Sequence, residues 1–195
     1  MTENKSVVTP QRFVSGFTYK DYIAQIKVNK EQFEQYYKTA QLSAKDEAFF
    51  RKAAGAPDGV AKMLVLGEEW CPDVFRGMPL MARIAEASGI EMRIFPRDRN
   101  LDIMNEFLNR GEFMSIPVVV FYTKDLGYIC HWIERPEMAN RERAKVQESI
   151  KKEKPGASEQ ELRTLVGERT RARYPAWQQE SVREIRRMLA QKLGI

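Results

Sequence analysis

Short apolar runs and amphipathic stretches alternate through the middle of the chain, and their order predicts strands separated by helices. The run 63–66 is too short for a helix and is closed by a glycine, which is typical of a strand buried on both faces. Residues 90–95 alternate between apolar and polar positions, as a half-buried strand does. Two further β-rich runs, 115–122 and 128–133, flank a short turn that contains aspartate and glycine. They predict a hairpin whose second strand lies at the sheet edge.

Helical periodicity covers most of the remaining chain. Pro72 is suited to the first turn of a helix that runs to about Ser88, and Asn100 is the expected N-cap of a helix that reaches Arg110. Aromatic-rich helices are predicted within 18–54. The C-terminal third is predicted to contain three helical segments, over 137–153, from Ser158, and from Pro175 to Leu193.

These elements predict an α/β fold in which helices flank a central sheet of about four strands. We expect one domain over 1–195, with a core at about 62–150 and helical extensions at 18–54 and 158–193. Residues 1–16 show no periodicity and are expected to form a partly ordered lead-in.

Composition and charge narrow the class of protein. Hydrophobic residues make up 43% of the 195 positions and charged residues 30%, as in a globular protein. The longest apolar stretch, 116–122, is far too short to cross a bilayer, and residues 1–13 lack the apolar segment of a signal peptide, so a cytoplasmic protein without membrane contact is expected. The net charge of +5 comes from residues 134–195, which hold 15 Lys and Arg against 10 Asp and Glu. Because acidic residues are interleaved there, we interpret the region as a solvated helical surface and expect no specific nucleic-acid binding.

Cys71 is the main candidate for chemistry because it stands where the first strand gives way to a helix. Unpaired N–H groups and the positive end of the helix dipole favour an anion at that place, which promotes ionisation of the thiol to the nucleophilic thiolate. Glu68, Glu69 and Asp73 surround the thiol with negative charge and oppose its ionisation, so the direction of the net effect stays open. The alternative interpretation of Cys71 is a small buried hydrophobic residue.

The other candidate groups are expected to be structural. Strand alternation places Cys130 on one face with Tyr128 and Trp132, and His131 on the opposite face, which indicates packing rather than a resolving thiol or a catalytic base. Two cysteines and one histidine offer no metal-ligand spacing, so no metal site is predicted. The arginines within and after the second strand are interpreted as solvated turn residues: Arg93, Arg97 and Arg99. The alternative is that they supply positive charge near the thiolate or bind a glutathione carboxylate.

Three short motifs carry a resemblance to a known superfamily. They are Trp70-Cys71-Pro72-Asp73 after the first strand, Ser115-Ile116-Pro117 before the hairpin, and Trp132-Ile133-Glu134-Arg135-Pro136 after it. In this order and between these elements they resemble the thioredoxin superfamily over about 62–150. Within it, the chain is most similar to the bacterial thioredoxin-like proteins whose active site reads Trp-Cys-x-Asp-Cys.

The resemblance implies a thioredoxin-like sheet and a surface that binds an extended partner chain. On that surface Cys71 would be the catalytic residue, and a cis peptide bond before Pro117 would face it. The residues that would bind substrate are Trp70, Pro72, Asp73, Ile116 and Pro117. The implied partners are protein thiols or disulfides, with no resident cofactor and with glutathione as a co-substrate, whereas the oligomeric state is left open.

Val74 departs from the pattern of the superfamily. Dithiol members carry a second cysteine three residues after the first, and it releases the substrate from the mixed disulfide. Valine cannot do this. Two hypotheses follow: a thiol-disulfide protein that uses Cys71 alone and is resolved by an external thiol such as glutathione, or a redox-inactive binding module that holds a protein partner.

Overall fold

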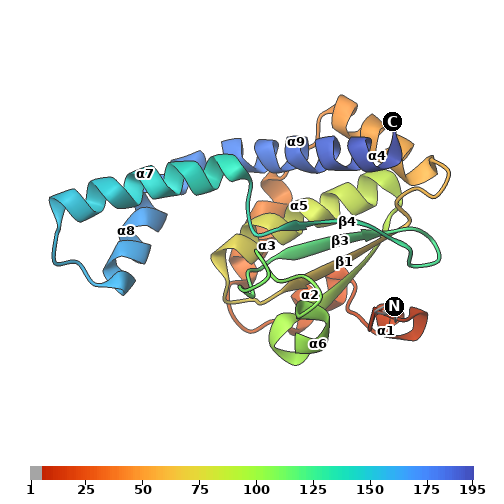
Figure 1. Cartoon of the computed structure of the whole chain (residues 1–195), viewed down its shortest axis with the longest axis horizontal. Coiled ribbons are helices and arrows are strands. Elements are labelled where there is room, and N and C mark those ends of the chain that lie inside the picture. The colour runs from red at the N-terminus through yellow and green to blue at the C-terminus, as the bar shows by residue number, and fades with distance from the viewer. Residues whose placement is uncertain (1–5) are drawn as a thin grey trace. The chain divides into compact units, whose positions relative to one another are not determined.

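The computed structural model describes residues 6–195, which form two compact units. The first unit contains the described chain as far as Glu134 together with Ile185–Ile195, and it holds the four-stranded sheet. The second unit, Arg135–Glu184, is helical. The predicted α/β class, a central sheet flanked by helices, is confirmed (Figure 1). The single domain over 1–195 stays a prediction.

The sheet is mixed, with the strand order β2-β1-β3-β4. The strands are β1 (Lys62–Gly67), β2 (Glu91–Pro96), β3 (Val118–Tyr122) and β4 (Tyr128–Ile133). β1 pairs with β2 in parallel and with β3 antiparallel, and β3 pairs antiparallel with β4. Because β1 is central, it is buried from its second residue to its last, as its unbroken apolar run predicts. The expected edge position of β4 is also confirmed.

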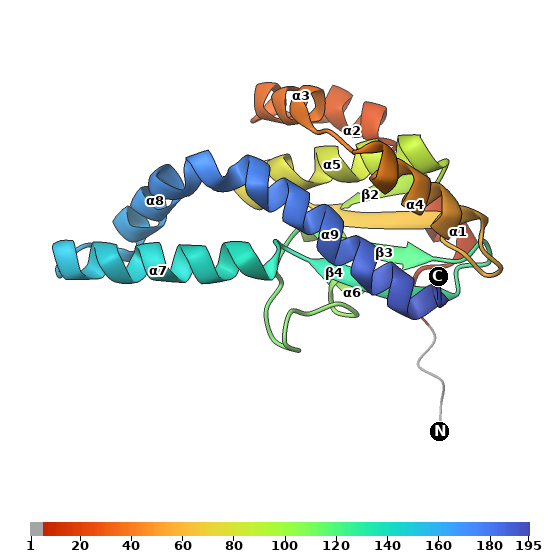
Figure 2. The same cartoon turned by 90° about the horizontal axis from the view of Figure 1, so that it is seen from above.

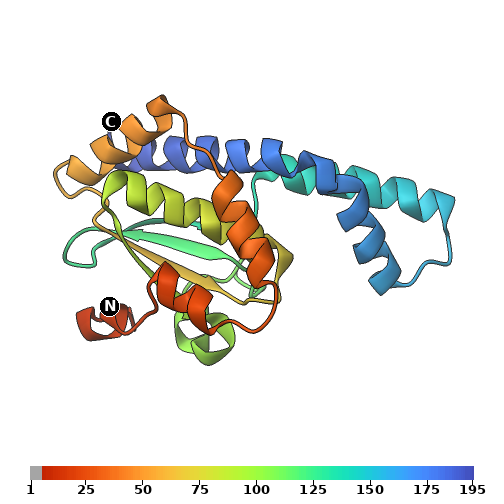
Figure 3. The ribbon, with the colours of Figure 1, turned by 180° about the vertical axis from the view of Figure 1, so that it is seen from behind.

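Helices cover the sheet of the first unit on both sides. Helix α5 (Pro72–Ser88) lies over one face, and the short α6 (Leu101–Met104) lies beyond the other (Figures 1 and 3). Helices α3 (Lys30–Thr39) and α4 (Ala44–Gly55) pack on α5, and α2 (Tyr19–Gln25) lies against β2. Within the predicted helical region 18–54, α3 and α4 therefore form a second layer over α5, while α2 contacts the sheet itself.

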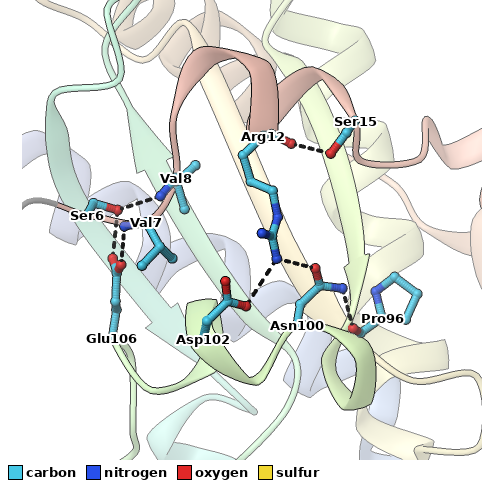
Figure 4. A network of polar contacts seen from close by, with 9 residues as sticks. All are labelled: Ser6, Val7, Val8, Arg12, Ser15, Pro96, Asn100, Asp102 and Glu106. Atoms are coloured by element: carbon cyan, nitrogen blue, oxygen red, sulfur yellow. Dashed lines mark hydrogen bonds and ion pairs between the residues drawn. The ribbon is translucent and has the colours of Figure 1, made fainter.

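The segment before α2 is more regular than a partly ordered lead-in. It contains α1 (Pro10–Val14), and Phe17 exchanges backbone hydrogen bonds with Ile94 at the free edge of β2. Figure 4 shows two further attachments: the Val7 amide donates to the Glu106 carboxylate over 2.6 Å, and Arg12 donates to Asn100 and Asp102. The prediction of a partly ordered lead-in is therefore wrong for residues 6–16. Residues 1–5 of that predicted lead-in lie outside the described residues.

The predicted helix from Asn100 to Arg110 is also wrong in its length, because α6 ends at Met104. The Asn100 side chain does not cap the helix; it donates to the Pro96 carbonyl over 2.7 Å instead (Figure 4). After α6 the chain turns back on itself, and Asn109 and Phe113 form an isolated bridge. This loop leads directly into Ser115, Ile116 and Pro117.

The second unit consists of helices that share a small apolar core. It contains α7 (Glu137–Glu153), α8 (Glu159–Thr170), a 3-10 turn (Arg171–Arg173) and the first part of α9 (Tyr174–Leu193), as the periodicity predicts. Helix α8 packs on α7 (Figure 2), with Ile150, Leu162 and Val166 where the two helices meet. Trp177 is buried in this unit and donates to the Glu142 carboxylate over 2.7 Å.

The last turns of α9 belong to the first unit. There Ile185 and Leu189 are completely buried, and Arg186 donates to the Asp46 carboxylate of α4 over 2.7 Å. Across residues 6–195, no helix combines the length and the apolar character that a membrane crossing requires.

Candidate functional site around Cys71

The turn between β1 and α5 presents Cys71 at the start of the helix. Cys71 is the N-cap residue of α5, and its carbonyl accepts hydrogen bonds from the Val74 and Phe75 amides, each over 3.1 Å. Gly67 ends β1 where the helix comes closest: a Cβ atom at this position would lie 2.7 Å from Cγ1 of Val74. The strand can deliver the cysteine so close to its own helix because position 67 has no side chain.

The structure brings Cys71 together with Ile116 and Pro117, as the resemblance to the thioredoxin superfamily implies. Cys71 is 8% exposed, and its Sγ lies 3.8 Å from the Ile116 carbonyl oxygen, to which it donates a weak hydrogen bond. The peptide bond between Ile116 and Pro117 is cis. Gly77 of α5 faces the Pro117 ring, since a Cβ atom at position 77 would lie 3.4 Å from its Cγ. The start of α5 and the start of β3 therefore form the two walls around the sulfur.

Trp70 is the exposed member of this group, with half of its surface in solvent. The Arg97 guanidinium lies 5.2 Å from the centre of its ring, and Arg97 also donates to the Met114 carbonyl over 3.2 Å. Arg97 therefore joins the Cys71 turn to the loop before Pro117, which corrects its interpretation as a solvated turn residue. Met114 and Phe113 expose 41% and 51% of their surfaces, so this side of the site is apolar.

Val74 occupies the position at which the dithiol pattern has its second cysteine. Its side chain is completely buried beneath the first turn of α5, against Gly67. Pro72 is the first residue of that turn, and Asp73 lies 3.8 Å from Arg76, three residues further along. The first turn thus presents one sulfur, one packed aliphatic side chain and one paired carboxylate.

Glu68 and Glu69, which the sequence suggests as negative charge beside the thiol, each accept a hydrogen bond from the backbone of another segment. The Glu69 carboxylate accepts from the Lys27 amide over 2.6 Å, and the Glu68 carboxylate accepts from the Asp98 amide over 2.7 Å. Burial raises the pKa of Glu68 above its ordinary value. Tyr22 is buried beside this turn, and its pKa is raised far above the ordinary range, first by burial and then by Glu68.

Cys130 and His131 lie away from this turn, on the edge strand. Cys130 is 3% exposed, and burial raises the pKa of its thiol to about 12. His131 is half-buried, which lowers the pKa of its imidazole, and its Nδ1 lies 2.7 Å from the Tyr128 hydroxyl. The expectation that Tyr128 shares the face of Cys130 is therefore wrong. A register shift in the pairing of β3 with β4 breaks the alternation between the two residues.

Several residues of the site carry no local signal in the sequence. Lys27, Asn29, Arg97 and Asp98 reach the Cys71 turn from other segments, and the hydrogen bonds of Glu68 and Glu69 span 30 to 42 positions of sequence. Only the tertiary fold brings them together. In the described part of the chain, no group of three or more His, Cys, Asp or Glu residues is arranged to hold a metal ion.

Comparison with known proteins gives both a family and structural relatives. A family model described as thioredoxin matches residues 16–149. A crystal structure of a protein of unknown function from Pseudomonas aeruginosa is similar, with a TM-score of 0.60, 16% identity, and coverage of 83% of this chain and 94% of that one. An HIV epitope scaffold gives a TM-score of 0.65, 13% identity, and coverage of 94% and 99%. At these identities the likeness concerns the fold alone. A search of curated proteins found no match.

Proposed function

Because the chain belongs to the thioredoxin family, we propose that it is a thiol-disulfide protein that acts through one cysteine, Cys71, with an external thiol such as glutathione to complete the cycle. The observation that carries the proposal is the place of the sulfur, at the N-cap of α5 and 3.8 Å from the carbonyl before Pro117. Trp70, Pro72, Asp73, Ile116 and Pro117 would form the surface that receives the partner.

The chemistry consists of two exchanges at the same sulfur. The Cys71 thiolate attacks the glutathione sulfur of a protein mixed disulfide; a new disulfide forms on Cys71, and the partner leaves as a thiolate that takes up a proton from water. A second glutathione thiolate then attacks that disulfide, so oxidised glutathione leaves and the Cys71 thiolate returns. Overall, the protein mixed disulfide and one free glutathione thiol become a protein thiol and one molecule of oxidised glutathione. Val74 makes the second thiol necessary, because it offers no internal nucleophile.

The geometry balances two influences on the thiol. The N-terminus of α5 favours the thiolate, whereas the hydrogen bond from Sγ to the Ile116 carbonyl requires the protonated form. An incoming chain that pairs with the backbone of the Ile116–Pro117 loop would move the sulfur away from that carbonyl. Binding of the partner would then itself favour the thiolate, because it removes the acceptor that holds the thiol proton.

The test is the alkylation of Cys71 by iodoacetamide across pH, together with turnover of a glutathione mixed disulfide. We expect turnover that depends on added glutathione. In the Val74→Cys variant, a thiol three positions along the helix should resolve the intermediate and make the first turnover independent of added glutathione. A Cys71 that titrates as an ordinary free thiol, with no turnover by the wild type, would contradict the proposal.

The alternative is a binding module without redox activity, which uses the same surface to hold a protein partner. It is favoured by Val74 and by the nearly complete burial of the thiol. Cys71→Ser separates the two functions, since it removes the nucleophile but preserves the shape of the surface. Loss of turnover in this variant, with no detectable binding of the partner by either form, would exclude the module.

The proposal also includes a subgroup of the superfamily, a class of partner and a compartment. The Trp-Cys-x-Asp-Cys subgroup is supported by Trp70, Cys71 and Asp73 and by the two motifs that flank the hairpin. The proposed partners are protein thiols and disulfides, and the proposed compartment is the cytoplasm, where glutathione keeps thiols reduced.

A further inference from the structure

The connection between α2 and α3 reaches across to the residue two positions before Cys71. The Lys27 amide donates to the Glu69 carboxylate over 2.6 Å, and the Asn29 side-chain amide donates to the Glu69 carbonyl over 2.9 Å. One short segment thus holds both the side chain and the main chain of Glu69. These hydrogen bonds join positions 42 and 40 residues apart, so only the folded state forms them.

Asn29 adopts an unusual conformation to make this hydrogen bond. It stands at the N-cap of α3, where an asparagine side chain ordinarily accepts a hydrogen bond from the first turn of its own helix, but no such bond is formed. Its backbone is left-handed, with φ of 57°, a region that asparagine adopts more readily than most residues other than glycine. The side chain therefore gives up the usual cap of its own helix and donates to the Glu69 carbonyl instead.

The preceding residue of the turn, Glu68, is held in the same way. The Glu68 carboxylate accepts from the Asp98 amide over 2.7 Å, while the Glu68 carbonyl accepts from the Cys71 amide over 3.1 Å. Glu68 and Glu69 thus use their carboxylates to fasten the backbone that leads into Cys71. Movement of either attachment would shift the sulfur relative to the helix N-terminus and to Ile116.

We infer that Glu69, held by Lys27 and Asn29, is a positioning residue for Cys71. Its hydrogen bonds fix the turn so that Sγ stays at the N-terminus of α5 and within reach of the Ile116 carbonyl. The inference rests on the proposed use of Cys71 as a nucleophile, and it adds the α2–α3 connection to the parts that determine how the thiol reacts.

Substitutions of Asn29 test this directly. Asn29→Gly keeps the left-handed conformation and removes only the donor, whereas Asn29→Asp keeps the shape but presents a carboxylate to the Glu69 carbonyl. For both variants we expect a pH midpoint of Cys71 alkylation different from that of the wild type, measured by site-resolved mass spectrometry from about pH 6 to about pH 10. Turnover of a glutathione mixed disulfide should fall by about tenfold or less, as expected for one lost hydrogen bond.

Three comparisons make the result specific. Glu69→Ala should reproduce the effect, and Glu69→Gln, which can still accept from the Lys27 amide, should lie closer to the wild type. Asp58→Gly is the matched control, because Asp58 is an exposed left-handed residue after α4, and its change should leave the Cys71 profile as it is. Alkylation of Cys130 in the same molecules measures any overall loss of stability, and Cys130 should stay protected.

An unchanged Cys71 profile in both Asn29 variants would overturn the inference. So would a parallel rise in the alkylation of Cys71 and Cys130, because that would show a loss of stability rather than of position. Failure of the proposed function would give a different result, because the wild type itself would show no turnover. The pH profiles of Cys71 alkylation would still show whether Glu69 positions the thiol.

Discussion

The two cysteines of this chain are buried to nearly the same degree but lie in different surroundings. Cys71 is 8% exposed and Cys130 is 3% exposed. Cys71 sits at a helix N-terminus, between a carbonyl and an exposed tryptophan, on a turn that other segments hold through hydrogen bonds. Cys130 lies on an edge strand opposite Phe121, next to the register shift of that strand, and burial raises its pKa to about 12. Burial alone therefore does not distinguish a candidate nucleophile from a packing residue, whereas the local dipoles and hydrogen bonds do.

The largest difference is expected when each cysteine is removed in turn. Cys71→Ser should abolish turnover of a glutathione mixed disulfide, a loss of at least about 100-fold, since no other thiol can take its place. Cys130→Ala should retain turnover, because the pKa of this thiol keeps it protonated at neutral pH. Activity measured side by side on the two purified variants checks the prediction. Activity that follows Cys130 instead would reverse the comparison.

Two glycines offer a test through packing. Gly67→Ala places a Cβ atom 2.7 Å from Cγ1 of Val74 and 3.0 Å from the Met78 methyl group, so we expect about 1–3 kcal/mol of destabilisation in urea unfolding. It should also change the alkylation of Cys71, since the start of α5 must move away from β1.

The matched change beside the other cysteine is Gly127→Ala, in the turn before β4. Its new Cβ atom would meet the Thr123 hydroxyl at 2.8 Å, and this half-buried side chain can rotate aside if it gives up the hydrogen bond that it accepts from the Gly127 amide, at a cost of about 1 kcal/mol. Equal destabilisation by the two substitutions would show that the Cys71 turn tolerates movement as well as the hairpin does.

The elements that carry the site could be predicted from the sequence because their signals are local. The apolar run of β1, Pro72 at the start of α5 and Gly89 at its end define the strand and helix around Cys71 without any tertiary knowledge. The match of the three motifs places Ile116 and Pro117 opposite the thiol, and the structure brings these residues together. Periodicity and end signals are therefore sufficient for the scaffold.

The residues that hold the site in place could not be predicted in the same way. Nothing near Asn29 in the sequence shows that its side chain leaves its own helix for Glu69, and nothing near Arg97 shows that it lies over Trp70. The helix expected to reach Arg110 ends early because Asn100 bonds backwards to Pro96 rather than capping forwards. In each case a local partner and a distant partner compete for the same side chain with similar interaction energies, and the tertiary fold determines which interaction forms.

Alkaline unfolding isolates the contribution of Cys130. Its thiol has a pKa of about 12 in the folded chain against an ordinary value of 9.0, because burial disfavours the thiolate. Below pH 9 both folded and unfolded chains carry the proton, and the stabilisation is complete. Between pH 9 and 12 the unfolded chain loses its proton first, so stability falls as the pH rises. Cys130→Ala should lack this part of the fall, whereas Cys71→Ser should retain it; urea unfolding of both variants at stepwise pH checks the prediction.

The smallest expected effect concerns the exposed surface beside Cys71. Arg97→Ala removes the guanidinium that lies over the half-exposed Trp70 ring and should lower stability by about 0.5–1 kcal/mol, as a cation–π interaction with a partly solvated ring does. Acrylamide quenching of tryptophan fluorescence should increase, because Trp70 is half exposed while Trp132 and Trp177 are 8% and 5% exposed.

Arg83 provides the matched control for Arg97. It lies 5.3 Å from the Tyr37 ring, a similar interaction without a tryptophan, so Arg83→Ala should change stability by a comparable amount and leave the quenching as it was. If Arg97→Ala leaves both the quenching and the alkylation of Cys71 unchanged, Arg97 does not join the Trp70 turn to the loop at Met114 in solution. Glu68 and Glu69 would then be the residues that attach the Cys71 turn to other segments.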